Sequence, residues 1–426
     1  MLKNFKCDVS RDLLIPDVEF YQMNLDGPVK DAIAKGEFED ELPSWSKFVA
    51  HPIKAKGFFN NVLAALFYGK GGYDELNVDY QSDSSPEKSR VAMMFLPTNT
   101  RTDKRHDEEF SPMQIIEGIA AQALPGFTII NLSGGTVSND KKVTNHNAEK
   151  IAKEAVWNAK KKGNSVLFIA AQMAQRSFSV PEITELYLAY DQGCNGATVQ
   201  KMSRTLTPFD PSKVGRVYSL SFDPNRDDKF DAIILETVMN YQKNNPAKSA
   251  KEAMRDVLRT IDIFKCGVNG AIKIDGDAYL EDAMSRNSIS RVIGKASNLG
   301  ILSATDITAL ANGNSAYFKA AKVARTNKGK TRHAKQKKKP SVQATNLVEK
   351  ELVKAREVIV TIVENVDFLV YGSGADTVGD AIKIISSDKT MQECVEEEFG
   401  VCFYTIEHLF HNGVINQNLL ELLHDK

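Results

Sequence analysis

The chain has 426 residues, enough for about two to three domains. Its 54 basic and 55 acidic residues nearly cancel, so the overall charge does not attract a strongly charged partner. Any surface that binds nucleic acid must therefore be a local patch of basic residues. Five scattered cysteines without a metal-binding spacing indicate a reducing cytoplasm. No run of about 18 apolar residues occurs, so no membrane span is expected.

The first 88 residues are assigned to a connector, or to the remnant of a domain that precedes the main one. An amphipathic helix is expected over residues 54–68, and Gly69 suits its C-terminal end. The polar stretch YQSDSSPEKS then leads into the most regular part of the chain.

Apolar strands alternate with helices through residues 89–240. One helix is expected after Ser111, a good N-cap, with Pro112 at its first position, and another ends in lysines just before Gly163. This alternation predicts an α/β domain built on a parallel sheet. The expected strands lie at residues 90–97, 127–135, 165–171, 183–191 and 215–222.

The remainder is expected to be mainly helical. Residues 241–325 form a helical accessory region, in which PAKSAKEAMRDVLRTIDIF is the clearest helix, and residues 346–426 form a helical C-terminal unit. Between them, residues 326–345 form a basic linker. Within NKGKTRHAKQKKK, eight of thirteen residues are Lys, Arg or His. This stretch suits either salt-sensitive affinity for nucleic acid or a soluble tether.

Ligands of open α/β sheets bind beyond the carboxyl ends of the strands, so the loops at those ends are the places to search for function. The loop after residues 165–171 carries Gln175, Arg176 and Ser179, whose side chains suit a phosphate backbone or a nucleotide. The alternative is a solvated connection with one surface arginine.

A second polar stretch, QKMSRTLTP, places Gln200 and Arg204 four residues apart, on one face of a helical turn. The planar, permanently charged guanidinium of arginine suits a γ-phosphate. The alternative is a solvated helix with a structural arginine. No metal site is predicted, because a calcium-like loop that begins at Asp223 has Asp228 and Ile234 where glycine and glutamate are required.

Four stretches in succession, RVAMMFLP, INLSGG, VLFIAAQMAQRSFSVPEI and QKMSRTLTP, resemble the motifs of the second RecA-like domain of superfamily 2 helicases. The similarity covers about residues 90–222 and is greatest to restriction-type or bacteriophage-encoded members. It implies a RecA-like parallel sheet domain followed by mainly helical C-terminal regions. It also implies ATP as the nucleotide and nucleic acid as the partner, DNA being favoured over RNA. A viral source would place the protein in the host cytoplasm.

The resemblance implies roles for individual residues. Arg204 would be the catalytic arginine finger that reaches the γ-phosphate of ATP, and Gln200 would contact the nucleotide beside it. Ser179 stands where the family often has the aspartate of Arg-Gly-x-Asp, at a nucleotide-binding position. The implied contacts to the nucleic-acid strand are Ser133, Gly134, Gln175 and Arg176. Thr207 occupies the position of a frequent second arginine.

A motor of this class also needs a first RecA-like domain with a phosphate-binding loop and an acidic pair for Mg²⁺. GKT at residues 329–331 lacks the preceding glycine, since Ala324 stands there, and no apolar strand leads into it. We therefore expect that first domain, and the Mg²⁺ that it holds, to lie outside this stretch: either the chain is a fragment, or a separate polypeptide supplies the N-terminal helicase half. The chain alone is then expected not to hydrolyse ATP.

Two functions follow. The first is the second motor domain of an ATP-dependent nucleic-acid helicase or translocase, which supplies the arginine finger and strand contacts. The alternative is a non-enzymatic, RecA-like nucleic-acid-binding or scaffold subunit, which the replacements at Thr207 and Ser179 favour.

Overall fold

The computed structural model forms two compact units. One comprises residues 1–241 and 255–281, and the other comprises residues 242–254 and 282–426. The structure describes residues 17–38, 43–70, 73, 76, 89–97, 111–133, 137–138, 141–144, 147–171, 178–190, 201–202, 204–207, 213–222, 229–259, 261–267, 270–285, 288–295, 302, 304–320, 342–415, 420 and 423.

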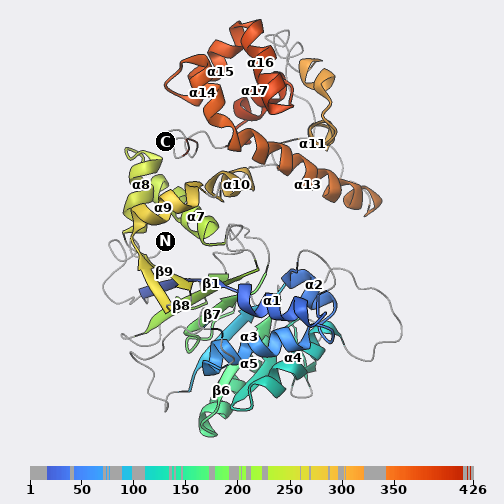
Figure 1. The fold of residues 1–426 in the computed structure, drawn as a ribbon, viewed down its shortest axis with the longest axis vertical. Helices are drawn as coiled ribbons and strands as arrows, with labels where there is room; N and C mark the ends of the chain where they lie inside the picture. The colour runs from blue at the N-terminus through green and yellow to red at the C-terminus, as the bar shows by residue number, and fades with distance from the viewer. Residues whose placement is uncertain are drawn as a thin grey trace. The chain divides into compact units, whose positions relative to one another are not determined.

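The first unit is built on an eight-stranded sheet in the order β10-β9-β1-β8-β7-β2-β6-β3 (Figure 1). All neighbours are parallel except β9 and β10. The α/β class expected from the sequence is therefore confirmed. The strands are β1 (Asp17–Asn24), β2 (Val91–Phe95), β3 (Phe127–Asn131), β6 (Ser165–Ala170), β7 (Glu185–Leu188), β8 (Val214–Ser221), β9 (Asp262–Gly267) and β10 (Gly270–Ile274).

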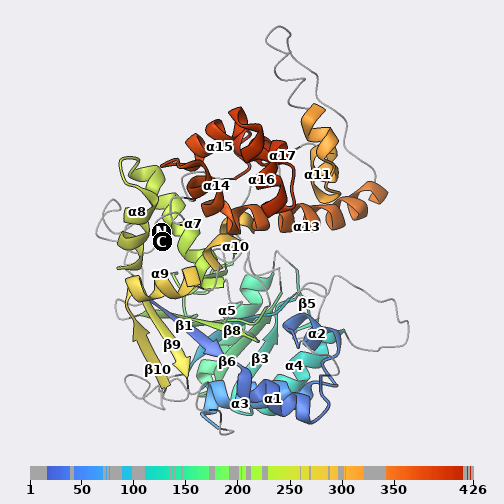
Figure 2. The same ribbon diagram turned by 45° about the horizontal axis from the view of Figure 1, so that its top comes forward.

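Helices cover both faces of this sheet. β2 is followed by α4 and then β3, and β3 by α5 and then β6, so the two crossovers run in opposite directions along the sheet and place α4 and α5 on opposite faces (Figure 2). The helices of the unit are α1 (Asp26–Ala34), α2 (Trp45–Ala50), α3 (Lys56–Tyr68), α4 (Pro112–Ala123), α5 (Ala148–Lys161) and α7 (Lys229–Asn244). A small antiparallel pair joins β4 (Val137–Ser138) to β5 (Lys141–Lys142).

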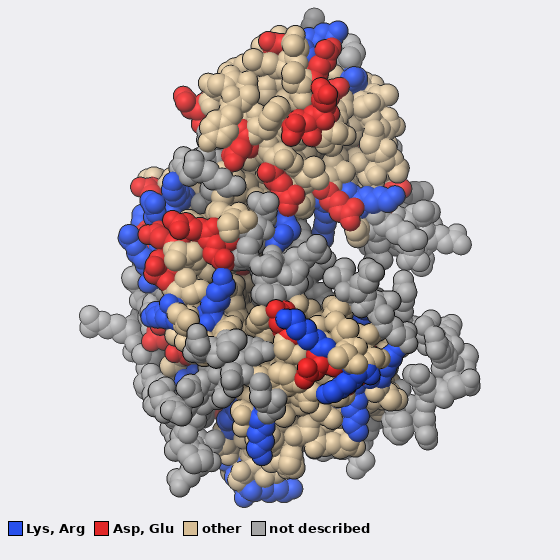
Figure 3. All heavy atoms as spheres, in the orientation of Figure 1, with Lys and Arg blue, Asp and Glu red and all other residues tan. Residues whose placement is uncertain are grey.

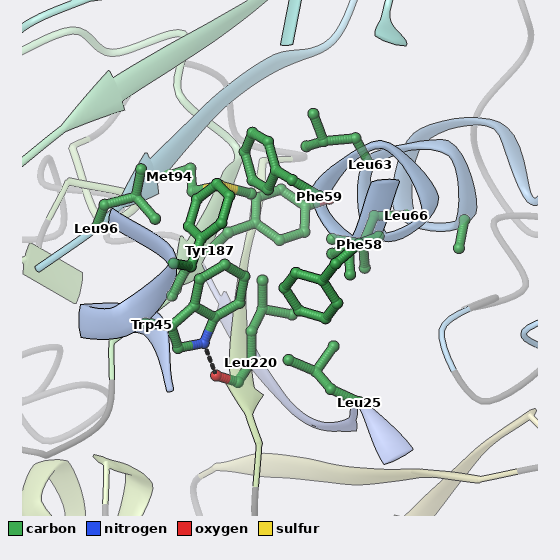
Figure 4. Close-up of a cluster of buried hydrophobic side chains, with 14 of the residues drawn as sticks. Leu25, Trp45, Phe58, Phe59, Leu63, Leu66, Met94, Leu96, Tyr187 and Leu220 are labelled. Atoms are coloured by element: carbon green, nitrogen blue, oxygen red, sulfur yellow. Dashed lines mark hydrogen bonds between the residues drawn. The ribbon is translucent and has the colours of Figure 1, made fainter. Parts of the chain in front are cut away.

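Residues 17–68, which the sequence assigns to a connector, contribute β1 and three helices to this unit. β1 pairs along its whole length with β8 and also pairs with β9. Trp45 is fully buried, and its indole Nε1 donates to the Leu220 carbonyl oxygen at 2.8 Å (Figure 4). The N-terminal segment thus completes the core on the face that α3 and α4 cover.

Aromatic rings stack across four adjacent strands on that face. Tyr187, Tyr218, Tyr21 and Phe264 follow one another with centroid separations of 4.7, 4.9 and 4.8 Å. Each such pair adds about 0.5–1.5 kcal/mol beyond the area that it buries. The row therefore stabilises the pairing of β1 with the strands beside it.

Three helix ends match the sequence prediction closely. Ser111 caps α4 in a capping box with Gln114, and Pro112 begins the helix. Gly69 ends α3 in a left-handed conformation, with φ of 60°, and Gly163 follows α5 with φ of 70°.

The stretch PAKSAKEAMRDVLRTIDIF differs from the expected single helix. It forms α8 (Ala250–Leu258) and then enters β9 at Asp262. The end of α8 lies close to α9 (Gly276–Ser285): a Cβ added to Gly276 would lie 2.7 Å from the Cβ of Leu258. α9 therefore packs closely on the end of α8, and β9 joins the sheet.

The second unit is helical. Its elements are α10 (Ser288–Lys295), α11 (Ala304–Ala311), α13 (Val342–Glu364), α14 (Val366–Ser373), α15 (Val378–Ser387), α16 (Lys389–Phe399) and α17 (Phe403–His411). α13 packs on both α10 and α11. Short caps separate the later helices, since Thr377 accepts from the Asp380 backbone N–H, and Asp388 accepts from those of Thr390 and Met391.

Candidate nucleotide and nucleic-acid site

The carboxyl ends of β2, β6 and β7 lie level with one another. Phe95 is in register with Ala170 on one side and with Leu188 on the other. The connection that leaves β2 leads to β3 on one side, and the connection that leaves the adjacent strand β7 leads to β8 on the other, so the two connections diverge here. Such a point is where open α/β sheets bind ligands.

Two buried lysines lie at this point. The Nζ of Lys201 is 3.7 Å from the centroid of the Tyr190 ring and 5.4 Å from that of Phe95. The Nζ of Lys229, at the start of α7, donates to the Tyr190 carbonyl oxygen at 3.0 Å. Lys201 is 8% exposed and Lys229 is 0% exposed, so both amines lie inside the protein below the carboxyl edge.

Arg204 lies in a turn three residues after Lys201, and its backbone N–H donates to the Lys201 carbonyl oxygen at 3.1 Å. Its guanidinium donates from Nη1 to the carbonyl oxygen of Phe178. Burial lowers the pKa of Arg204, and the nearby carboxylate of Glu149 opposes that shift. The arginine is therefore half-buried between the β6–β7 loop and the first turn of α5.

Glu149 connects these two parts. Its carboxylate accepts from the Ser179 backbone N–H at 3.0 Å and from Lys153 at 2.6 Å. The Lys153 bond is the main cause that lowers the pKa of Glu149. Arg204 thus contacts the Ser179 loop at the Phe178 carbonyl, and the Glu149 carboxylate that accepts from Ser179 also acts on its charge, although 25 residues separate Ser179 from Arg204 in the chain.

Lys213 connects the segment before β7 with the turn that carries Arg204. Its Nζ donates to the carbonyl oxygens of Pro181 at 2.7 Å and Thr207 at 2.8 Å. Burial lowers its pKa to about 8, while Glu182 opposes the shift. Thr205 is fully buried beside Gly215 of β8. These contacts position the turn that carries Arg204.

At the end of β3, the Ser133 backbone N–H donates to the side chain of Asn131 at 2.9 Å. Both residues are buried. Burial raises the pKa of Glu117 on α4, and hydrogen bonds with Asn131 oppose that shift. Ser133 therefore belongs to a closed turn on a strand that β6 separates from β2.

Four predicted site residues, Gln200, Gly134, Gln175 and Arg176, lie outside the described residues. Of the others, the structure brings Ser179 and Arg204 together, while Ser133 lies on a different strand end. Glu149 and Lys229 are absent from the sequence prediction. Glu149 stands in the first turn of α5, where acidic residues are favoured, and Lys229 is the first residue of α7; nothing in the sequence indicates which loop either side chain faces.

The guanidinium of Arg204 at this edge of the sheet suits an anionic ligand. Arginine has five N–H donors, so Arg204 has the chemistry to bind a phosphate oxygen. In this structure its Nη1 is directed to Phe178 and its charge lies close to Glu149. The residues present therefore fit a nucleotide phosphate if the guanidinium turns away from these two groups.

Among the described residues, no group of three or more His, Cys, Asp or Glu side chains is arranged to hold a metal ion. Within the part of the chain that the structure describes, no helix is both long and apolar enough to cross a bilayer.

No family model matches the chain, and none of the curated proteins matches it either. One solved structure that it resembles is an ATP-dependent Type ISP restriction-modification enzyme, LlaBIII, bound to DNA, with a TM-score of 0.37 and 9% sequence identity. The similarity covers 99% of this chain and 28% of that one. The chain thus spans less than a third of that enzyme's length.

Proposed function

We propose that the sheet-containing unit is the second motor domain of an ATP-dependent nucleic-acid helicase or translocase. The observation that carries the proposal is the contact of Arg204 with the Ser179 loop at the Phe178 carbonyl, beside strand ends where α/β sheets bind ligands. These two polar segments belong to VLFIAAQMAQRSFSVPEI and QKMSRTLTP, two of the stretches that resemble helicase motifs. A separate N-terminal half would hold ATP and Mg²⁺.

In this proposal ATP supplies phosphoryl transfer to water when it is bound by that partner half. Arg204 would leave Phe178 and Glu149 and place its charge against the γ-phosphate, as arginine fingers do. Gln200 would contact the nucleotide, and Ser179 would respond to the same movement through Glu149. Arg176, Gln175, Ser133 and Gly134 would contact the nucleic-acid strand, for which we propose DNA.

The test is DNA-stimulated ATP hydrolysis by the full chain mixed with a polypeptide that carries the phosphate-binding loop and acidic pair. Arg204→Ala is expected to lower kcat by about 10³-fold or more, the contribution usual for an arginine finger. Arg204→Lys keeps the charge but loses the planar fork, so it should restore only part of the rate.

The matched control is Arg255→Ala, which removes an exposed arginine whose Nε lies 3.6 Å from Asp277 in the same unit. It should leave the rate unchanged. An Arg204→Ala enzyme as fast as the Arg255→Ala enzyme would exclude the arginine finger. Turnover by the chain alone would exclude the need for a separate half.

One observation favours a second function, a non-enzymatic nucleic-acid-binding or scaffold subunit. The guanidinium of Arg204 donates to the Phe178 carbonyl of its own domain. Thr207 and Ser179 stand where active motors often have an arginine and an aspartate. For a scaffold, the full chain should bind single-stranded DNA with the same affinity whether or not the partner half and ATP are present.

A further inference from the structure

Trp157 is exposed on the outer face of α5. The chain has two tryptophans: Trp45 is fully buried, whereas Trp157 is 62% exposed. A tryptophan ring left in water forgoes a large gain from burial. Its indole offers a large, flat surface on which another ring or a cation can stack.

Lysines surround this ring. The Nζ of Lys161, one turn later, lies 4.6 Å from the centroid of the Trp157 ring. Lys153 and Lys160 stand one turn before and after Trp157 on the same helical face.

The acidic residues of α5 lie in its amino-terminal half, where each pairs with a lysine of the same helix. Glu149 binds Lys153 at 2.6 Å, and Glu154 lies 3.9 Å from Lys150. Within the described part of the chain, Lys160, Lys161 and Lys162 have no carboxylate within ion-pair distance. The positive charge is therefore concentrated beside Trp157, at the end of α5. Figure 3 shows Lys and Arg side chains gathered at the lower end of this unit.

A second aromatic residue with a lysine lies at the same, amino-terminal edge of the sheet. Tyr68 at the end of α3 is 37% exposed, and the Nζ of Lys70 lies 5.5 Å from its ring centroid. The Tyr68 hydroxyl accepts from the Gly126 N–H at 3.3 Å, and the Gly126 carbonyl accepts from Ser165 at 3.2 Å. Tyr68 is thereby held at the strand that begins three residues after Lys162.

We propose that the end of α5, with Trp157 and Lys160, Lys161 and Lys162, binds single-stranded nucleic acid. A base would stack on the exposed indole while the lysines contact the flanking phosphates, the combination that sequence-independent single-strand binders use. The charge selects this ligand over an apolar protein surface, which would have to desolvate three lysines without neutralising them.

This surface is separate from the site at the carboxyl edge. α5 begins beside Ser179 and Arg204 and runs to the opposite edge of the sheet, where β6 begins at Ser165. The inference does not rest on the motor function, because it requires neither ATP nor a partner half.

The experiment uses tryptophan emission, because the two tryptophans differ so strongly in exposure. The full chain is titrated with a 20-nucleotide oligo-dT at low salt, with emission and fluorescence anisotropy followed together. We expect binding to quench Trp157. In Trp157→Phe, the emission of buried Trp45 should not change on titration. Trp157→Ala should weaken binding about tenfold, the usual effect of losing one stacking platform.

Changing Lys160, Lys161 and Lys162 together to glutamine should lower the salt dependence, with a change of about two in the slope of log K against log salt. The control changes Lys383 and Lys389, exposed lysines of the second unit, to glutamine and should leave the slope unaltered. Binding without quenching of Trp157, or no binding, would overturn the proposal. Equal quenching by poly-glutamate would assign the surface to an acidic polypeptide and overturn it as well.

Discussion

At the scale of single residues, Lys213 offers a measurable dependence on pH. Burial lowers its pKa to about 8, below the ordinary value of 10.5 that it has in the unfolded chain. Between these values the unfolded state holds more protons than the folded state, so the free energy of unfolding gains from this residue as pH rises. The penalty of burying the charged form is fully present below pH 8.

We therefore predict that the wild-type protein gains stability relative to Lys213→Met as the pH is raised from about 7 to 10. The neutral amine keeps two N–H groups for the carbonyls of Pro181 and Thr207. Urea unfolding of both proteins at several pH values measures the difference. A difference that stays constant, or that moves toward the variant, would contradict the prediction.

Gly215 leaves room for the turn that carries Arg204. A Cβ at this position would lie 2.9 Å from both Cβ and Oγ1 of Thr205 and 3.1 Å from its carbonyl oxygen. Thr205 is fully buried, so packed neighbours surround it. We expect Gly215→Ala to lower the free energy of unfolding by about 1–3 kcal/mol, as overpacking does.

The control for Gly215→Ala is Gly118→Ala, in the middle of α4, where an added Cβ meets no atom within 4 Å. Alanine there should stabilise the protein by about 0.5–1 kcal/mol because glycine is a poor helix former. Denaturant unfolding compares the two. Equal effects of the two changes would show that Thr205 is free to adjust.

At the scale of elements, α10 and α13 approach closely at a glycine. A Cβ at Gly294 would lie 2.7 Å from Cγ2 and 2.9 Å from Cα of Val360. Gly294→Ala should separate the helices and destabilise the second unit by about 1–3 kcal/mol. Adding Val360→Ala should restore only part of this, because the contact with Cα remains.

Gly372 provides the comparison, since an added Cβ in α14 has nothing within 4 Å. Thermal unfolding followed by circular dichroism should place Gly294→Ala well below Gly372→Ala. A full rescue by Val360→Ala would show that the side chain alone, and not the helix backbone, sets the distance between α10 and α13.

Helices and strands that have clear capping or turn signals at their ends are predictable from this sequence. Ser111 and Pro112 begin α4, Gly69 ends α3, and β2 and β6 are almost wholly apolar because both of their faces are buried. β1 is harder to predict, since its segment DVEFYQMN carries several polar residues. β9 directly continues a helical pattern, and only Gly276 allows α9 to pack where that helix ends.

The candidate site is predictable in part for a similar reason. Ser179 and Arg204 follow strands in a recognisable order, so their loops are expected at one edge of the sheet. The Glu149 link between them depends on where the first turn of α5 lies, which is a matter of tertiary packing. Lys229 reaches Tyr190 from a helix that begins 39 residues later, and no local pattern indicates this contact.

At the scale of the whole molecule, the chain divides into two compact units, and each has its own buried apolar residues. Units with separate cores can unfold separately. Both tryptophans, Trp45 and Trp157, belong to the first unit, so tryptophan emission reports on that unit alone. Far-ultraviolet circular dichroism reports on the helices of both.

We therefore predict that the two signals give different urea transitions for the full chain. Gly294→Ala, in the second unit, should shift the circular dichroism curve to lower urea and leave the emission curve in place. Gly215→Ala, in the first unit, should shift the emission curve. Coincident curves that move together in both variants would show instead that the two units unfold as one cooperative body. A stability change in one unit would then lower the folded population of the other.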